Sequence, residues 1–173
     1  MNTANSRILV LVEPPTAFIR CVGRAGAERA RDFKQLVGRL ESQGIRQVCL
    51  DLTECKLMDS TFSGVLAALA TGPNPAVAPP PGCPEFVLVN PNERVRDLLD
   101  NLGVLPRVNV LEGQTSAGPT MPAVELAPGS QSRDEVRDAC LDAHRFLMAL
   151  DPRNVPKFQE LTRALEVEKA AGG

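Results

Sequence analysis

Two adjacent residues, Asp59 and Ser60, place a carboxylate and a hydroxyl directly before a run of small residues that favours a helix. Aspartate or serine at the start of a helix caps free backbone N–H groups, which is the simplest interpretation. The position also suits chemistry, because a phosphate on an exposed hydroxyl there would meet N–H donors and the positive end of the helix dipole. A phosphate would add about −1.5 to −2 charges beside Asp59 and could repel a docked partner. Two interpretations stay open at this point: capping alone, or a phosphorylatable hydroxyl on Ser60, with Thr61 as the alternative.

Catalysis by the Ser60 hydroxyl would require a base, and the sequence contains one histidine, His144. It lies on an expected helix far along the chain, where a lone histidine at the edge of an apolar stripe is more often a surface or packing residue. There is no G-x-S-x-G elbow around Ser60, and the glycines of segment 23–26 lack the spacing of a P-loop. We expect a protein that is not an enzyme, and a small serine hydrolase remains the less favoured alternative.

The composition is that of a globular protein, with 43% hydrophobic residues, 23% charged residues and a net charge of −2. Binding of single-stranded nucleic acid usually pairs a basic groove with stacking aromatics, whereas this chain has no Lys/Arg run, six Phe, no Trp and no Tyr. No segment approaches the ~20 apolar residues of a membrane span, and the N-terminus does not resemble a secretory signal. We expect a cytoplasmic protein with neither nucleic acid nor a membrane as its partner.

The cysteines form no recognisable ligand or disulfide pattern. They are odd in number and none forms a C-x-x-C pair; they are Cys21, Cys49, Cys55, Cys83 and Cys140. Each lies in or beside an apolar stretch, where a free cysteine behaves as a small buried hydrophobe. We therefore expect no metal, no disulfide framework and no cofactor.

Hydrophobic patterns predict an α/β domain over residues 7–112. Strands are expected at 7–12, 17–22, 47–52, 85–89 and 107–111, and helices at 27–43, 63–70 and 91–102. The proline-rich stretch 71–84 is expected to be a loop. Alternating strands and helices imply parallel pairing with right-handed crossovers, preceded by an antiparallel hairpin.

The chain beyond this domain divides into a linker and a pair of helices. Residues 113–131 lose periodicity and are rich in Gly, Pro, Ser and Thr, so they are predicted to be a linker. Residues 132–170 are predicted to form a C-terminal helical hairpin broken at Asp151-Pro152. Its two apolar stripes are Val136, Cys140, Ala143, Leu147 and Leu150, and then Phe158, Leu161 and Leu165. Such faces usually pack on their own domain; a homodimer is the second interpretation and docking to another protein the third.

The segment from Leu50 to Leu66 contains a strand ending at Asp51, a short loop, Asp59-Ser60 and a small-residue helix. It resembles the hallmark segment of STAS domains, the fold of bacterial anti-sigma-factor antagonists. Residues 18–24 resemble the second strand of that family, and the predicted order of elements matches to about Leu111. The resemblance implies a STAS-like fold: a mixed β-sheet with an N-terminal hairpin and helices packed on it, here with the C-terminal helical hairpin added.

The resemblance also implies a partner-switching cycle that regulates transcription. In this family the unphosphorylated antagonist binds an anti-sigma factor that is also a serine protein kinase, and thereby frees the sigma factor. The kinase phosphorylates the serine that corresponds to Ser60, and a serine phosphatase reverses the modification. The expected partner-binding residues are Asp51, Asp59, Ser60, Thr61, Phe62, Ser63 and Gly64.

Two features differ from the family pattern. Phe62 and Ser63 stand where the family commonly has a glycine and an aliphatic residue, whereas Gly64 matches the family's last glycine. An exposed Phe62 would widen a hydrophobic docking surface and a buried one would anchor the helix; the sequence leaves both open. The second feature is the C-terminal hairpin, which the minimal antagonist lacks. The main alternative function is therefore a STAS scaffold or dimerisation module that is not phosphorylated.

Overall fold

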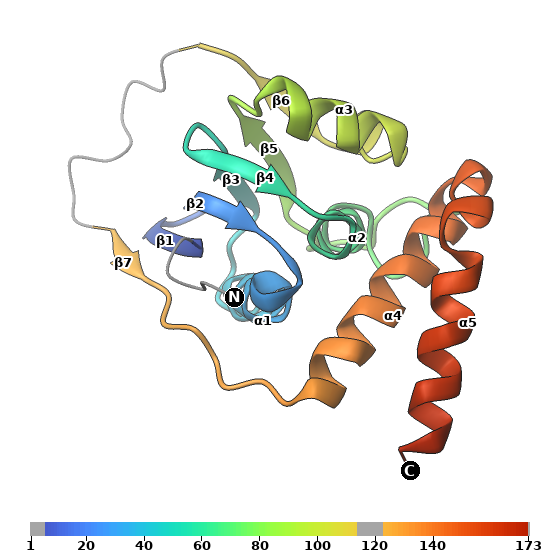
Figure 1. Ribbon diagram of the computed structural model, residues 1–173. Helices are drawn as coiled ribbons and strands as arrows, with labels where there is room; N and C mark the ends of the chain where they lie inside the picture. Colours follow the sequence, from blue (N-terminus) through green and yellow to red (C-terminus); the bar gives the residue numbers. More distant parts are fainter. Residues whose placement is uncertain (1–5, 114–122, 173) are drawn as a thin grey trace.

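The computed structural model describes residues 6–113 and 123–172, and a mixed sheet of seven strands forms its centre (Figure 1). The strand order is β6-β5-β3-β2-β1-β7, and β4 pairs with β2 beyond β3. The strands are β1 (Ser6–Glu13), β2 (Thr16–Ala25), β3 (Gln47–Asp51), β4 (Cys55–Met58), β5 (Glu85–Val89), β6 (Asn109–Leu111) and β7 (Val124–Glu125). As predicted, β1 and β2 form an antiparallel hairpin, and β2, β3, β5 and β6 run parallel.

The helices are α1 (Ala27–Ser42), α2 (Ser60–Thr71), α3 (Glu93–Asn101), α4 (Arg133–Leu150) and α5 (Val155–Ala171), with short 3-10 turns at Leu105–Arg107 and Pro152–Asn154. Of these, α1, α2, α4 and α5 form two layers on one side of this sheet, and α3 lies apart from them beside β4. α1 and α2 cover one face of the sheet, and α4 packs across their outer side (Figure 1). α5 folds back along α4. The C-terminal hairpin is thus a third layer over the two helices that cover the sheet.

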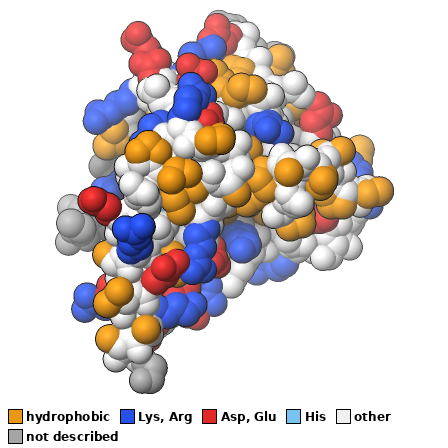
Figure 2. All heavy atoms as spheres, turned by 90° about the vertical axis from the view of Figure 1, so that its right-hand side faces the viewer, with side chains coloured by type: hydrophobic (Ala, Val, Ile, Leu, Met, Phe, Trp, Pro, Cys, Tyr) orange, Lys and Arg blue, Asp and Glu red, His pale blue; other side chains and the backbone are white. Residues whose placement is uncertain are grey.

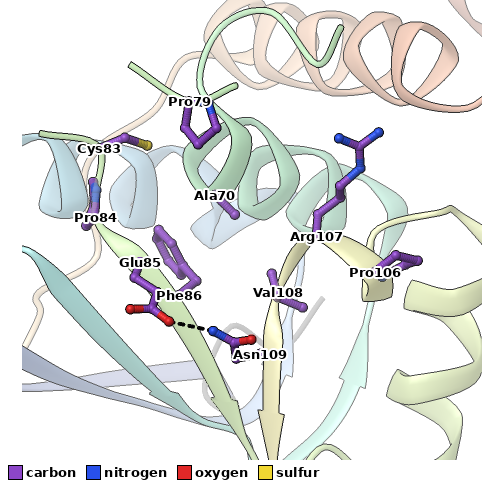
Figure 3. A pocket seen from close by; sticks show the side chains of 10 residues that line it. All are labelled: Ala70, Pro79, Cys83, Pro84, Glu85, Phe86, Pro106, Arg107, Val108 and Asn109. Atoms are coloured by element: carbon purple, nitrogen blue, oxygen red, sulfur yellow. Dashed lines mark hydrogen bonds between the residues drawn. The ribbon is translucent and has the colours of Figure 1, made fainter. Parts of the chain in front are cut away.

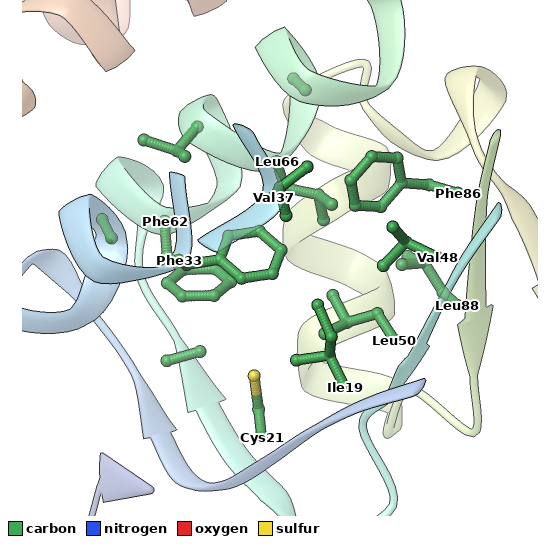
Figure 4. Close-up of a cluster of buried hydrophobic side chains, with 14 of the residues drawn as sticks. Ile19, Cys21, Phe33, Val37, Val48, Leu50, Phe62, Leu66, Phe86 and Leu88 are labelled. Carbon is green, nitrogen blue, oxygen red and sulfur yellow. The ribbon is translucent and has the colours of Figure 1, made fainter. Parts of the chain in front are cut away.

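The core lies between the sheet and the pair α1 and α2 (Figure 4). Along β2 every second residue from Ala17 to Cys21 is buried, as the two-residue period of a strand with one packed face requires. The rings of Phe33 and Phe62 stack with centroids 4.8 Å apart in the middle of this core. Phe62 is fully buried, so of the two interpretations that the sequence left open, the anchoring one is correct.

Several element boundaries differ from the sequence-based prediction for identifiable reasons. β2 does not end at Gly23: this glycine adopts a φ of 79°, the pairing register shifts there, and the strand continues to Ala25 beside β4. β4 was expected to be a loop because its four residues show no clear alternation. α2 begins at Ser60 rather than at residue 63, because Asp59 caps it.

The segment predicted as a linker is partly structured. Residues 114–122 lie outside the described residues. Of the remainder, β7 adds an edge strand beside β1, and the following residues cross α1 before α4 begins. There the backbone N–H of Gly129 donates to the Asp32 carboxylate, and the Arg29 guanidinium donates to the carbonyl oxygen of Leu126. The division of the chain into a domain, a linker and an extension stays a prediction.

Candidate functional site

Asp59 caps two helices at once. Its Oδ1 accepts a hydrogen bond of 2.9 Å from the N–H of Phe62 in the first turn of α2. Its Oδ2 accepts one of 2.8 Å from the N–H of Ala27, the first residue of α1. The guanidinium of Arg24 lies 3.9 Å from the same carboxylate. Asp59 therefore fixes where both helices begin, which is the structural role expected of an aspartate at this position.

The hydroxyl of Ser60 meets a histidine from the C-terminal hairpin. Ser60 is the first residue of α2, and its Oγ lies 2.8 Å from Nε2 of His144 on α4, 84 positions later in the chain. The expectation of a freely exposed hydroxyl is wrong for this conformation, because α4 covers the start of α2 and leaves Ser60 half-buried.

The hydrogen bonds of His144 determine which of its nitrogens carries a hydrogen. Nδ1 lies 2.7 Å from the carbonyl oxygen of Cys140, which can only accept, so Nδ1 donates and Nε2 accepts the hydrogen of Ser60. His144 is 2% exposed and its ring packs on Phe158. Burial lowers the pKa of His144 below its ordinary value of 6.5, while the Cys140 carbonyl and the Asp59 carboxylate oppose the shift. The imidazole is therefore neutral at pH 7.

The residues after Ser60 are also covered by α4. Thr61 is 4% exposed, and its hydroxyl lies 3.5 Å from the sulfur of Cys140. Gly64 allows the closest approach of the two helices: a Cβ added there would lie 2.6 Å from the carbonyl oxygen of Ala143. Of the residues for which the sequence predicts partner binding, Ser60, Thr61 and Gly64 are therefore covered by the C-terminal hairpin.

The turn of the hairpin is tied to the end of α3. Asn154 is fully buried, and its amide nitrogen donates to the carbonyl oxygens of Leu102 and Leu147 at 2.9 and 2.8 Å. Lys157 donates to the carbonyl oxygen of Asn101. A buried amide that donates to two carbonyls of different elements makes this anchor specific in geometry.

Three of the predicted partner-binding residues have other roles. Asp51, at the end of β3, pairs with Arg20 at 2.9 Å and accepts a hydrogen bond from the N–H of Thr53. Ser63 is fully buried, and its hydroxyl donates to the carbonyl oxygen of Asp59. Phe62 lies in the core. The expectation that a partner contacts Phe62 or Ser63 is incompatible with this burial.

Cavities in the described residues do not point to a substrate site at Ser60. A pocket of about 310 Å³ lies at the opposite end of α2, between the proline-rich loop and the starts of β5 and β6 (Figure 3). Its wall includes Arg107 and a hydrogen bond from Asn109 to Glu85. Ser60 and His144 line neither this pocket nor the two further pockets found among the described residues.

The cysteines differ in burial. Cys21 and Cys55 are buried, and burial raises the pKa of both thiols, that of Cys55 to about 11. Cys49, Cys83 and Cys140 are half-buried. Within residues 6–113 and 123–172, no cluster of His, Cys, Asp and Glu side chains is arranged to hold a metal ion. No helix in these same ranges has the length and hydropathy needed to cross a membrane.

Sequence reasoning missed the two hairpin residues that complete this site, His144 and Asn154. A signal for the first existed: His144 follows Cys140 by four residues and precedes Leu147 by three, so it lies on the buried stripe of α4. That spacing could have placed His144 at an interface, but it carries no information about Ser60. For Asn154 no comparable signal exists, because an asparagine in a short segment between two prolines, Pro152 and Pro156, normally indicates an exposed turn.

Comparison with known proteins gives the fold but no close relative. No family model matches the sequence, and no curated protein matches it. The structure is similar to that of an anti-sigma factor antagonist from Mycobacterium paratuberculosis, with a TM-score of 0.51 and 15% identity over 63% of this chain and 87% of that one. It is also similar to a Thermotoga maritima protein assigned as an anti-sigma factor antagonist, with a TM-score of 0.50 and 20% identity over 62% of this chain and 86% of that one. The chain therefore has the STAS fold that the sequence resemblance implies, and more than a third of it lies outside each match.

Proposed function

We propose that this protein is a STAS-type regulator, similar to anti-sigma-factor antagonists, that binds a protein partner through the surface around the start of α2. Phosphorylation of Ser60 switches that binding. The proposed partner is an anti-sigma factor that acts as a serine kinase, and a serine phosphatase reverses the modification. In this cycle the protein is not an enzyme; it presents a hydroxyl to the kinase and a surface to the partner.

The observation that carries this proposal is the position of Ser60 as the first residue of α2, in a STAS fold. Asp59 brings the beginnings of α1 and α2 together beside it, so the positive ends of two helix dipoles favour a phosphate there. The guanidinium of Arg24 adds a cation close to the same point. Charge introduced at such a position acts on any protein docked over it.

Peptide mass spectrometry on protein isolated from its native host tests the proposal. We expect phosphate on peptides spanning residues 57–66, assigned to Ser60 and absent from a Ser60→Ala variant. Peptides that stay unmodified under several growth and stress conditions would favour the scaffold or dimerisation module. Phosphate on Thr61 alone would move the switch by one residue, to a hydroxyl that α4 covers more completely.

A second candidate function, a serine hydrolase, is favoured by one observation: the 2.8 Å contact between Ser60 Oγ and a neutral His144 whose other nitrogen is held by a carbonyl. Against it, His144 is buried and the described pockets lie elsewhere. A fluorophosphonate probe separates the two functions. We expect no labelling of Ser60, and labelling that is lost in both Ser60→Ala and His144→Gln would establish the hydrolase instead.

A further inference from the structure

Polar contacts join the C-terminal hairpin and the segment just before it to the rest of the protein at several points. Near the base of the hairpin, Gln131 and the backbone of Gly129 bond to Asp32 on α1, and Glu135 on α4 pairs with Arg31. At its turn, Asn154 bonds to the end of α3. Between these points lies the middle contact, in which His144 accepts the hydroxyl hydrogen of Ser60. This middle contact involves the residue that the proposed function modifies.

Apolar packing supports α4 but hardly reaches α5. The buried side chains of α4 are those of Leu141, Ala143, His144, Leu147 and Leu150, whereas α5 buries only Thr162. The charged residues of α5 are all exposed; they are Lys157, Glu160, Arg163, Glu166, Glu168 and Lys169. On this side of the molecule, acidic and basic side chains are interleaved with hydrophobic ones (Figure 2). The docking of the hairpin therefore rests on one helix face, in which His144 is central.

The middle contact requires the hydrogen of the Ser60 hydroxyl. Phosphoryl transfer from a nucleoside triphosphate forms a bond between Oγ and phosphorus, breaks the bond to the nucleoside diphosphate, and removes the hydroxyl hydrogen as a proton. The resulting ester oxygen has no hydrogen to donate. Nε2 of His144 would then have no donor unless the ring took up a proton, which its burial disfavours, and a buried acceptor without a partner is destabilising.

Space acts in the same direction. At 2.8 Å, the gap between Oγ and Nε2 cannot admit a phosphorus atom and its three further oxygens. The close approach of Gly64 to Ala143 means that α4 already touches the backbone of α2 one turn further on, so little room is left between the two helices.

We infer that docking of the C-terminal hairpin and phosphorylation of Ser60 exclude each other, so that the hairpin is an internal competitor for the surface used by the kinase and the partner. This inference rests on the proposed function for the identity of the modification. In the unmodified protein α4 covers Ser60, Thr61 and Gly64, and a partner must displace it to reach them. Because the coupling is reciprocal, whatever loosens α4 favours phosphorylation, and phosphorylation loosens α4.

Hydrogen exchange of the full-length chain carrying genetically encoded phosphoserine at position 60 tests the inference without a kinase. We expect backbone amides of residues 141–150 to exchange at least about tenfold faster than in the unmodified chain. A chain with phosphoserine at position 42 is the matched control, because Ser42 is exposed at the end of α1 and its hydroxyl bonds within that helix. We expect exchange in α4 of this control to equal that of the unmodified chain.

Unchanged or slower exchange of α4 in the phosphoserine-60 chain would overturn the inference, and so would equal acceleration by phosphoserine 42, which would indicate a general effect of charge. Ser60→Ala provides a second measurement, because alanine also lacks the donor and is tolerated at a helix start. It should accelerate exchange of α4 in the same direction but less. If phosphoserine 60 does not loosen α4, the inference fails but the proposed function stands, because that function depends on whether the native host phosphorylates Ser60. If the host leaves Ser60 unmodified, the proposed function fails but the mutual exclusion of docking and phosphorylation stands.

Discussion

The two faces of α2 are built from different kinds of contact. The inner face packs Phe62 and Leu66 onto Phe33 and the sheet in the hydrophobic core. The outer face meets α4 through the Ser60–His144 hydrogen bond and the close approach of Gly64 to Ala143. The inner face stabilises the fold through the burial of large apolar side chains, whose contribution is spread over many atoms. The outer face depends on a hydrogen atom and on a missing methyl group, so a small chemical change can alter it.

The largest expected effect comes from breaking the inner face. Phe62→Ala removes a fully buried ring from the centre of the core and should lower the free energy of unfolding by about 3–5 kcal/mol. Urea denaturation followed by circular dichroism measures this loss. The control is Leu161→Ala, on a side chain that is 41% exposed, which should change stability by less than about 0.5 kcal/mol. A loss below about 1 kcal/mol for Phe62→Ala would contradict the anchoring role of its ring.

A smaller effect is expected at the anchor that holds the hairpin turn. Asn154→Ala leaves the buried carbonyl oxygen of Leu102 without its donor and leaves that of Leu147 with only the N–H of Asp151, and should cost about 1–3 kcal/mol. The loss should be concentrated in the hairpin, so amide exchange should accelerate in α4 and α5 much more than in β2 and β3. Uniform acceleration over the whole chain would show that the hairpin and the sheet unfold as one unit.

A third substitution, Gly64→Ala, tests the contact of the outer face of α2 with α4. Gly64→Ala adds a methyl group that would lie 2.6 Å from a backbone oxygen of α4, and overpacking of this kind costs about 1–3 kcal/mol. Within α2 itself, alanine is the better helix former by about 1 kcal/mol. We therefore expect faster amide exchange in α4 with little change in the melting temperature. Gly38→Ala is the control, since a methyl group there meets no atom within 4 Å.

The smallest effect is a dependence of hairpin docking on pH. Burial lowers the pKa of His144 in the folded protein, so below about pH 6.5 the unfolded chain binds more protons than the folded one. Docking of α4 should therefore weaken as the pH falls from 7 toward 5. The charged group facing His144 from α2 is Asp59, whose carboxylate reduces the effect without reversing it; on α4 itself the nearest group is the Cys140 thiol.

Amide exchange of α4 at several pH values, corrected for the intrinsic rate, measures this dependence. His144→Gln should remove it while keeping an acceptor for the Ser60 hydroxyl. An equal dependence in His144→Gln would assign it to carboxylates elsewhere in the hairpin, such as Glu135 and Asp138, whose pKa values are lowered by their hydrogen-bond partners.

The sequence alone predicts five of the strands in their order (all but β4 and β7), the parallel sheet after an antiparallel hairpin, and the two helices of the C-terminal hairpin. These follow from local periodicity: two in β2, and three to four in α1 and α4. It also placed Asp59 at the start of a helix, because capping depends on one residue and its neighbours along the chain. It missed β4 and the continuation of β2 past Gly23, which depend on the pairing of two distant strands.

Only the tertiary structure decided what the hydroxyl of Ser60 contacts. Periodicity shows that α4 has an apolar face, but not which surface that face covers. The 84 positions between Ser60 and His144 carry no local signal that they meet. For the same reason the sequence left the burial of Phe62 open, because a phenylalanine in the first turn of a helix lies inside or outside according to what packs on each side. The docking of one helix on another is set by the shapes of both, and these exist only once the chain has folded.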